Sequence, residues 1–121
     1  MSEFKKRIDS FKYALNGFKI LFKEEFNAKV HLVSAILALI LGFLFDLNTF
    51  EWIAILLAIA MVISSELINT AIEYLANFVS PEKRTVIKKV KDLAAAAVLT
   101  AAIVALFIGI IIFGTKILTL I

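Results

Sequence analysis

The sequence predicts an all-α integral membrane protein in which an N-terminal amphipathic surface helix precedes three transmembrane helices. Of the 121 residues, 62% are hydrophobic and 19% charged, with a mean hydropathy of +0.99. Soluble domains have an apolar share of about 45–50%, and so short a chain cannot hide this excess from water. The charged residues also fall into clusters that separate three apolar stretches. We therefore expect lipid to cover most of the apolar side chains of one domain, residues 1–121.

Each apolar stretch has the length of a membrane span. A helix rises 1.5 Å per residue, so roughly 20 residues cross a hydrocarbon core about 30 Å thick. The expected spans are residues 28–47, residues 50–79 with a cytoplasmic extension, and residues 93–113, which carry no charge. Residues 80–92 are expected to form a cytoplasmic loop. In this loop, Ser80-Pro81 predicts an N-cap followed by proline at the first position of a short helix.

Residues 1–24 predict a helix of a different kind. Large apolar residues recur alternately four and three positions apart, which places them on one helical stripe: Phe4, Ile8, Phe11, Leu15, Phe18 and Phe22. Five lysines lie off the stripe, as in basic helices that rest in the membrane interface. Packing against a partner helix remains open. A signal peptide is not expected, because no apolar core with a small-residue cleavage site follows the first charges.

The positions of lysine and arginine predict the orientation. Seven of these residues, the last of them Lys29, precede the uncharged part of the first span, five lie between the second and third spans, and one follows the third. Because positively charged flanks stay in the cytoplasm, we expect the N-terminus inside and the C-terminus outside. Phe50 and Trp52 would mark the outer aromatic belt. The alanine-rich third span predicts close helix packing in an oligomer or a tight bundle.

Polar residues interrupt the second span on one helix face. Glu66, Asn69, Thr70 and Glu73 stand at positions i, i+3, i+4 and i+7. Counted from Phe50, Glu66 lies roughly 24 Å into the bilayer, and Glu73 lies about one turn beyond its inner boundary. A carboxylate within a membrane helix indicates function by default. The alternatives are a protonated Glu66 bonded to a neighbouring helix and a solvated Glu73.

Further charged residues are expected at the same inner level. Glu25 precedes the first span and Asp92 precedes the third; alone, each would be an ordinary flanking charge. Together they predict an acidic cluster beside five basic residues: Lys83, Arg84, Lys88, Lys89 and Lys91. Mg²⁺ is usually held by one or two carboxylates, such as Glu25 and Glu73, plus substrate phosphates, and lysines suit the phosphates. With Glu66 accepting a proton from a lipid hydroxyl, the pattern predicts phosphoryl transfer from a nucleotide to a lipid alcohol.

Two other motifs are not expected to take part in this chemistry. Residues 109–116 imitate a phosphate-binding loop, but Gly-Thr-Lys stands where the motif requires Gly-Lys-Ser/Thr, and no strand precedes it. His31 is the only histidine, and we interpret it as an ordinary interfacial residue. There is no cysteine, which excludes disulfides and thiolate metal sites. No nucleic-acid partner is expected.

The polar face is part of a longer pattern. Residues 66–73, Glu-Leu-Ile-Asn-Thr-Ala-Ile-Glu, are followed 18 residues later by Lys91-Asp92-Leu-Ala-Ala-Ala-Ala-Val98. This pattern closely resembles the signature of the bacterial diacylglycerol kinase and undecaprenol kinase family, and the similarity runs from about Phe11 to Phe113. The resemblance implies a homotrimer with active sites between subunits, Mg²⁺ and ATP, and a place in the bacterial inner membrane with the active site cytoplasmic.

The resemblance also implies residue roles. Glu66 would be the general base and meet the lipid hydroxyl, with Asn69 and Asp92 as further catalytic residues. Glu25 and Glu73 would hold Mg²⁺ and contact ATP. Other nucleotide-binding positions are implied at Lys6, Tyr13, Glu82, Lys83, Arg84, Lys91 and Asp92. Ala95 stands where the family has a serine beside the lipid site.

The lipid itself is less sharply indicated. The Tyr-Ala-x-x-Gly pattern from Tyr13 and the Glu-x-Asn-x-x-x-His pattern from Glu25 resemble undecaprenol kinases more than diacylglycerol kinases, in which the position of His31 tends to be acidic. Undecaprenol is therefore favoured over diacylglycerol. Two rival classes remain: a small proton-coupled transporter using Glu66, which would need acids around a midplane cavity, and a non-catalytic assembly subunit, which would not explain the polar face.

Overall fold

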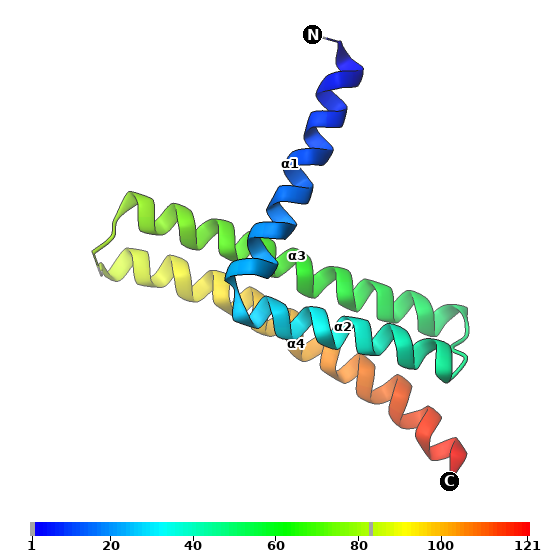
Figure 1. Ribbon diagram of the computed structural model, residues 1–121. Coiled ribbons are helices and arrows are strands. Elements are labelled where there is room, and N and C mark those ends of the chain that lie inside the picture. Colours follow the sequence, from blue (N-terminus) through cyan, green and yellow to red (C-terminus); the bar gives the residue numbers. More distant parts are fainter. Residues whose placement is uncertain (1, 83) are drawn as a thin grey trace.

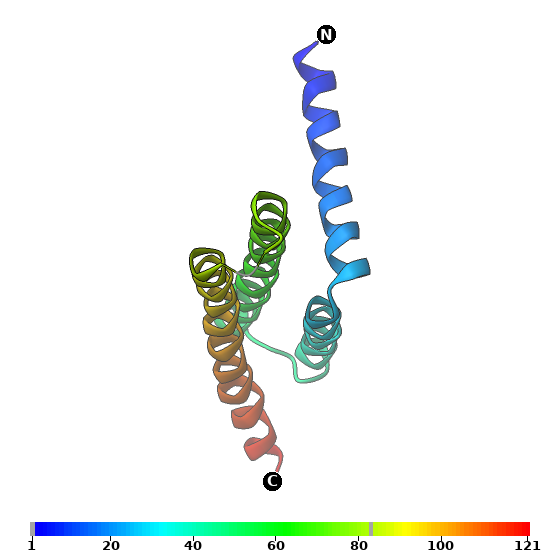
Figure 2. The same ribbon diagram turned by 90° about the vertical axis from the view of Figure 1, so that its left-hand side faces the viewer.

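The computed structural model describes residues 2–82 and 84–121, and their regular structure is entirely helical (Figure 1). Helix α1 spans Glu3–Glu24, α2 Phe26–Leu44, α3 Thr49–Val79 and α4 Thr85–Leu120. Helices α3 and α4 run side by side, α2 lies along α3 and farther from α4, and α1 projects away from the three (Figure 2). Within the described residues, α2, α3 and α4 are long and apolar enough to cross a membrane. The predicted all-α fold is confirmed, and it contains three candidate spans.

The connection between α3 and α4 differs from the expected loop. Ser80 ends α3 as its C-cap, with its N–H donating to the carbonyl of Ala76 over 3.0 Å, and the next helix begins only at Thr85. The predicted N-cap at Ser80 with Pro81 as first helical residue is therefore wrong. A residue before proline is pushed out of the α region, and Ser80 is extended, with φ −150° and ψ 102°. Proline here stops the preceding helix, and most of residues 80–92 belongs to α4.

A single residue, Glu25, joins α1 to α2. Its backbone is extended, with φ −103° and ψ 115°, so it ends one helix and begins the next. Leu21 and Ala28 are buried on either side of this corner, each about 1% exposed. The buried residues pack the corner between α1 and α2, and Glu25 at this corner lies within electrostatic range of Glu66 on α3.

The turn between α2 and α3 is tightly built. Asp46 has a positive φ of 54°, a conformation that the short side chain of aspartate tolerates. Asn48 and Glu51 form a capping box, in which each side chain accepts the other residue's backbone N–H over 2.9 Å. Leu47 is buried with Ile55 and Ile112 in the core at this end of the bundle.

Helices α3 and α4 pack along most of their length. Buried alanines such as Ala76, Ala94 and Ala101 permit this close approach. At one end Lys91 Nζ donates to Asn77 Oδ1, and at the other Lys116 Nζ lies 3.1 Å from Glu51 Oε1. These two contacts set the axial register of α4 on α3.

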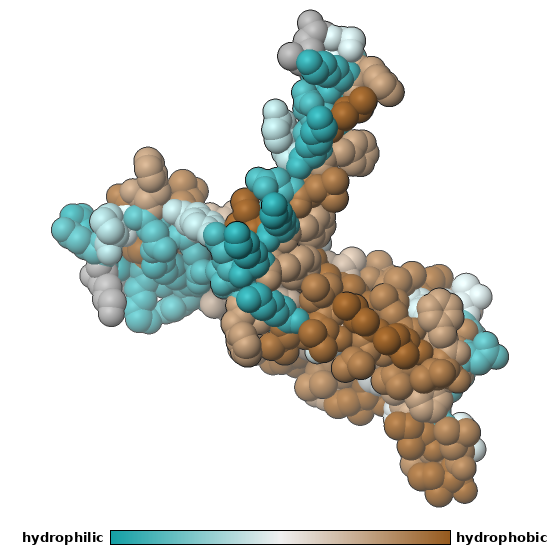
Figure 3. All heavy atoms as spheres, in the orientation of Figure 1, coloured by the Kyte–Doolittle hydropathy of each residue, from teal (hydrophilic) through white to brown (hydrophobic). Residues whose placement is uncertain are grey.

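The surface of the molecule is divided between apolar and polar regions. Hydrophobic atoms cover the three-helix bundle, whereas hydrophilic atoms gather along α1 and at the end of α3 and α4 that carries their connection (Figure 3). Large apolar side chains such as Leu106, Phe107 and Ile110 are about 60% exposed. Water would make such exposure unfavourable, so this is the surface of a membrane protein.

Candidate functional site

The polar face predicted on the second span is a buried polar cluster on α3. Glu66 is 3% exposed and Thr70 5%, while Asn69 and Glu73 are half-buried. Three atoms of this face, Glu66 Oε1, Asn69 Oδ1 and Thr70 Oγ1, are buried without a hydrogen-bond partner among the described residues. Most buried polar groups in proteins are paired, and an unpaired one is destabilising. Unpaired oxygens gathered on one helix face therefore indicate a site that binds something from outside this chain.

His31 contacts this cluster from α2. Its Nε2 lies 3.3 Å from Glu66 Oε1, and the two side chains are 25% and 4% exposed. The two side chains are in close contact without forming a hydrogen bond, and Glu66 Oε1 has no partner among the described residues. The interpretation of His31 as an ordinary interfacial residue did not foresee this contact. The signal was present in the Glu25-x-Asn27-x-x-x-His31 pattern, which places the histidine less than two helical turns from another predicted site residue.

Two further carboxylates lie near Glu66. Glu25 at the α1–α2 corner and Glu73 two turns along α3 are within electrostatic range of it. No cluster of three or more His, Asp or Glu side chains in the described part of the chain is arranged to hold a metal ion. Mg²⁺ is usually bound through only one or two protein carboxylates together with substrate phosphates. The oxygen donors of Glu25 and Glu73 thus fit Mg²⁺ in the presence of a nucleotide.

Lys91 and Asp92 stand near the end of the polar face that carries Glu73. Lys91 is hydrogen-bonded to Asn77, which lies one helical turn beyond Glu73. The exposed Asp92 accepts a hydrogen bond of 2.7 Å from Lys88 Nζ, one turn earlier on α4. The structure therefore brings Lys91 toward the carboxylates through Asn77, a residue that the sequence did not single out.

The remaining predicted residues show no contact with Glu66 among the described residues. Lys6, which is 3.7 Å from Glu3, and Tyr13, which is 73% exposed, stand on the projecting α1, roughly 28 and 18 Å from Glu25 along the helix axis. Glu82 and Arg84 are exposed and 3.7 Å apart in the α3–α4 connection. Ala95 is exposed on α4. The predicted residue Lys83 lies outside the described residues.

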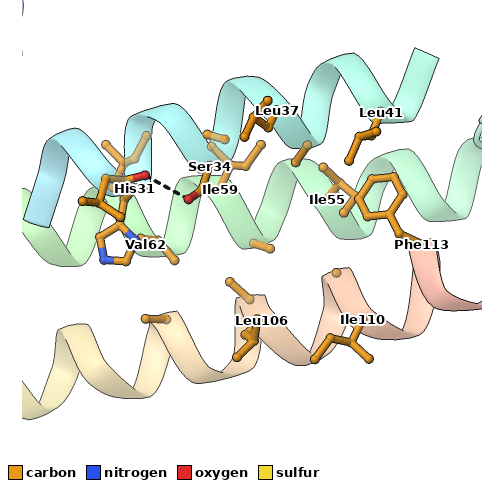
Figure 4. A pocket seen from close by; sticks show the side chains of 18 of the residues that line it. His31, Ser34, Leu37, Leu41, Ile55, Ile59, Val62, Leu106, Ile110 and Phe113 are labelled. Carbon is orange, nitrogen blue, oxygen red and sulfur yellow. Dashed lines mark hydrogen bonds between the residues drawn. The ribbon is translucent and has the colours of Figure 1, made fainter. Parts of the chain in front are cut away.

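An apolar groove of about 760 Å³ begins beside this site. It runs between α2, α3 and α4, from His31 and Val62 at one end to Phe113 at the other (Figure 4). His31 and Ser34 contribute its polar side chains, and Ser34 Oγ already donates to the carbonyl of Val30 over 2.9 Å. The groove is therefore suited to a hydrocarbon chain whose polar end lies near Glu66.

Fold and site together define a membrane-embedded protein with an acidic site at one end of an apolar groove. The sequence profile of the prokaryotic diacylglycerol kinases matches residues 12–113, and the chain belongs to this family. An undecaprenol kinase of Bacillus subtilis is 36% identical over 95% of this chain and 94% of its own length. A diacylglycerol kinase of Synechocystis is 32% identical over 83% of this chain and 58% of its own length. The protein is accordingly a lipid kinase, with a lipid alcohol and ATP as substrates.

Proposed function

We propose that this protein transfers the γ-phosphoryl group of ATP to the hydroxyl group of undecaprenol and releases the lipid monophosphate. The observation that carries the proposal is a buried carboxylate with an unpaired oxygen, Glu66, beside the opening of an apolar groove. The choice of lipid is supported by similarity to an undecaprenol kinase over nearly the whole chain. The second candidate is diacylglycerol, favoured by the similarity to the Synechocystis protein.

In this proposal Glu66 is the general base. The lipid hydroxyl donates to its buried Oε1, and the carboxylate takes the proton as the lipid oxygen attacks the γ-phosphorus. Asn69 lies one turn along the same face and orients the reacting groups. Catalysis then depends on positioning and electrostatic stabilisation, as is usual for phosphoryl transfer. The hydrocarbon chain of the lipid occupies the groove that starts at His31.

The nucleotide would bind at the end of the polar face that carries Glu73. Glu25 and Glu73 supply the oxygen ligands for Mg²⁺, which when bound neutralises charge on the phosphates. Lys91 leaves Asn77 to contact a phosphate, and Asp92 lies beside it as a further catalytic residue. The other nucleotide-binding positions proposed are Lys6, Tyr13, Glu82, Lys83 and Arg84.

We further propose a homotrimer with active sites between subunits. The support is that one chain keeps Lys6 and Tyr13 far from its own Glu66, and that its described residues leave oxygens of Glu66, Asn69 and Thr70 unpaired. A neighbouring copy could supply both the missing nucleotide contacts and cover for the exposed apolar surface. In such an assembly Ala95 would lie beside the lipid headgroup.

The proposed setting is the bacterial inner membrane, with α1 lying in the cytoplasmic interface. Support comes from the hydrophilic and hydrophobic atoms that occupy opposite sides of α1 in Figure 3. Basic residues concentrate before α2 and between α3 and the apolar part of α4, which favours a cytoplasmic N-terminus and site and an external C-terminus.

The test is a phosphorylation assay with purified protein in detergent micelles, Mg-ATP and either undecaprenol or diacylglycerol. We expect a higher kcat/KM with undecaprenol, measured as labelled lipid phosphate. A higher kcat/KM with diacylglycerol would identify diacylglycerol as the preferred substrate. Consumption of ATP without a phosphorylated product from either lipid would overturn it.

Replacing Glu73 should weaken the use of Mg-ATP. In Glu73→Gln a charged ligand becomes a neutral amide, so we expect the KM for Mg-ATP to rise at least about tenfold. The KM for the lipid should stay near the wild-type value. Both are obtained by varying one substrate while the other is saturating.

The matched control for this variant is Glu24→Gln, which removes an exposed acid next to Glu25. The control should leave both KM values unchanged. A Glu73→Gln variant in which only the lipid KM rises would contradict the assignment of Glu73 to the nucleotide side.

A further inference from the structure

The proposed reaction leaves a proton on a side chain that water hardly reaches. The side chain of Glu66 is 4% exposed, and the proton that it takes from each lipid hydroxyl must leave it before the next turnover. Asn69 and Thr70, its neighbours on the same face, do not titrate near neutral pH. Glu25 and Glu73 are committed to the metal and nucleotide. An exit for the proton therefore has to come from another element.

His31 has the position and chemistry of such an exit. Its Nε2 is 3.3 Å from Glu66 Oε1, and 25% of its side chain is exposed, against 4% for the side chain of Glu66. Histidine exchanges protons readily near neutral pH. The ring belongs to α2, whereas Glu66 belongs to α3, and Glu66 Oε1 has no hydrogen-bond partner among the described residues, so it is free to accept one from a substrate hydroxyl.

We propose that His31 is the proton outlet of the active site, an inference that rests on the proposed lipid kinase reaction. In the chemical step the lipid O–H bond breaks and its proton joins Glu66 Oε1. The lipid oxygen bonds to the γ-phosphorus, while the bond from phosphorus to the bridging oxygen breaks and its electron pair leaves with ADP. The O–H bond on Glu66 then breaks as an N–H bond forms at Nε2. The imidazolium finally releases a proton to water, which restores the neutral ring and the carboxylate.

Removing the outlet should affect repeated turnover but not the first one. In His31→Gln the amide keeps a polar group beside Glu66 but cannot accept a proton near neutral pH. Glu66 can still take one proton, so a rapid burst of about one lipid phosphate per site should precede a steady state slowed roughly 100-fold. Rapid-quench measurements with undecaprenol and Mg-ATP give the burst amplitude and both rates. In His31→Ala, added imidazole should accelerate the steady state in proportion to its concentration.

The matched control is Lys29→Gln, which removes an exposed basic side chain two residues earlier on α2. It should retain the wild-type rates. Wild-type steady-state turnover in His31→Gln would contradict the role of His31 as proton outlet. So would a first turnover of His31→Gln as slow as the later ones, together with no effect of imidazole on His31→Ala. Wild-type protein that makes no lipid phosphate would instead overturn the proposed function itself, and the outlet with it.

Discussion

Glu66→Gln should abolish phosphorylation of the lipid, with kcat lowered at least about 100-fold. The amide has nearly the size of the carboxylate but cannot accept the hydroxyl proton, so the loss falls on the chemical step. Because the nucleotide is assigned to other residues, binding of Mg-ATP should persist. The measurements are kcat at saturating substrates and equilibrium binding of a fluorescent ATP analogue.

The thermal stability of Glu66→Gln distinguishes a loss of catalysis from a loss of folding. Glu66 Oε1 has no hydrogen-bond partner among the described residues, so replacing the buried acid by an amide breaks no such bond, and the thermal midpoint should be unchanged or raised. The matched control is Ser65→Ala on the preceding position, whose hydroxyl only donates to the carbonyl of Val62 over 2.8 Å. This control should keep its activity. Wild-type turnover in Glu66→Gln would remove Glu66 from the role of base.

Gly42→Ala should destabilise the hairpin of α2 and α3. A Cβ at this position would lie 2.6 Å from Cη2 of Trp52, closer than two carbon atoms can approach. The indole cannot move freely, because it also packs against Phe43 with ring centroids 4.8 Å apart. Overpacking of this kind is unfavourable by about 1–3 kcal/mol, partly offset by about 1 kcal/mol of better helix propensity.

Gly114→Ala is the matched control for this substitution. It also replaces a helical glycine, but its Cβ would meet nothing within 4 Å, so only the gain in helix propensity remains. We expect the free energy of unfolding of the two variants to differ by about 1–3 kcal/mol, measured by titrating micelle-bound protein with denaturing detergent. Equal stability would show that Trp52 can move away without loss.

The polar face of α3 illustrates what local spacing predicts well. Glu66, Asn69 and Glu73 share a face because helical periodicity alone places residues three, four and seven apart together. The three spans follow in the same way from the length of the apolar stretches. Ser80-Pro81 shows the limit of such reasoning, because the same dipeptide suits the end of one helix and the start of another. Only the backbone decides between them.

The contacts between helices could not be predicted from the sequence. His31 with Glu66, Asn77 with Lys91 and Glu51 with Lys116 each join residues on different helices. A rotation of α3 by a third of a turn, or its shift by one turn, would separate all three pairs, because each of them includes a residue of α3. The hydropathy pattern of the sequence would be unchanged. The interpretation of His31 as an ordinary interfacial residue did not include its contact with Glu66 for this reason.

The amino-acid sequence by itself determined that this protein is helical, that three of its segments can span a membrane, and that acidic side chains share one face near one end of a span. These properties depend on composition and on the helical period, which are local. The tertiary structure decided that Glu66 is buried against His31, that a groove leads away from this pair, and that Lys6 and Tyr13 stand far from it. These properties depend on how helices pack, and packing is set by the fit of side chains from distant parts of the chain.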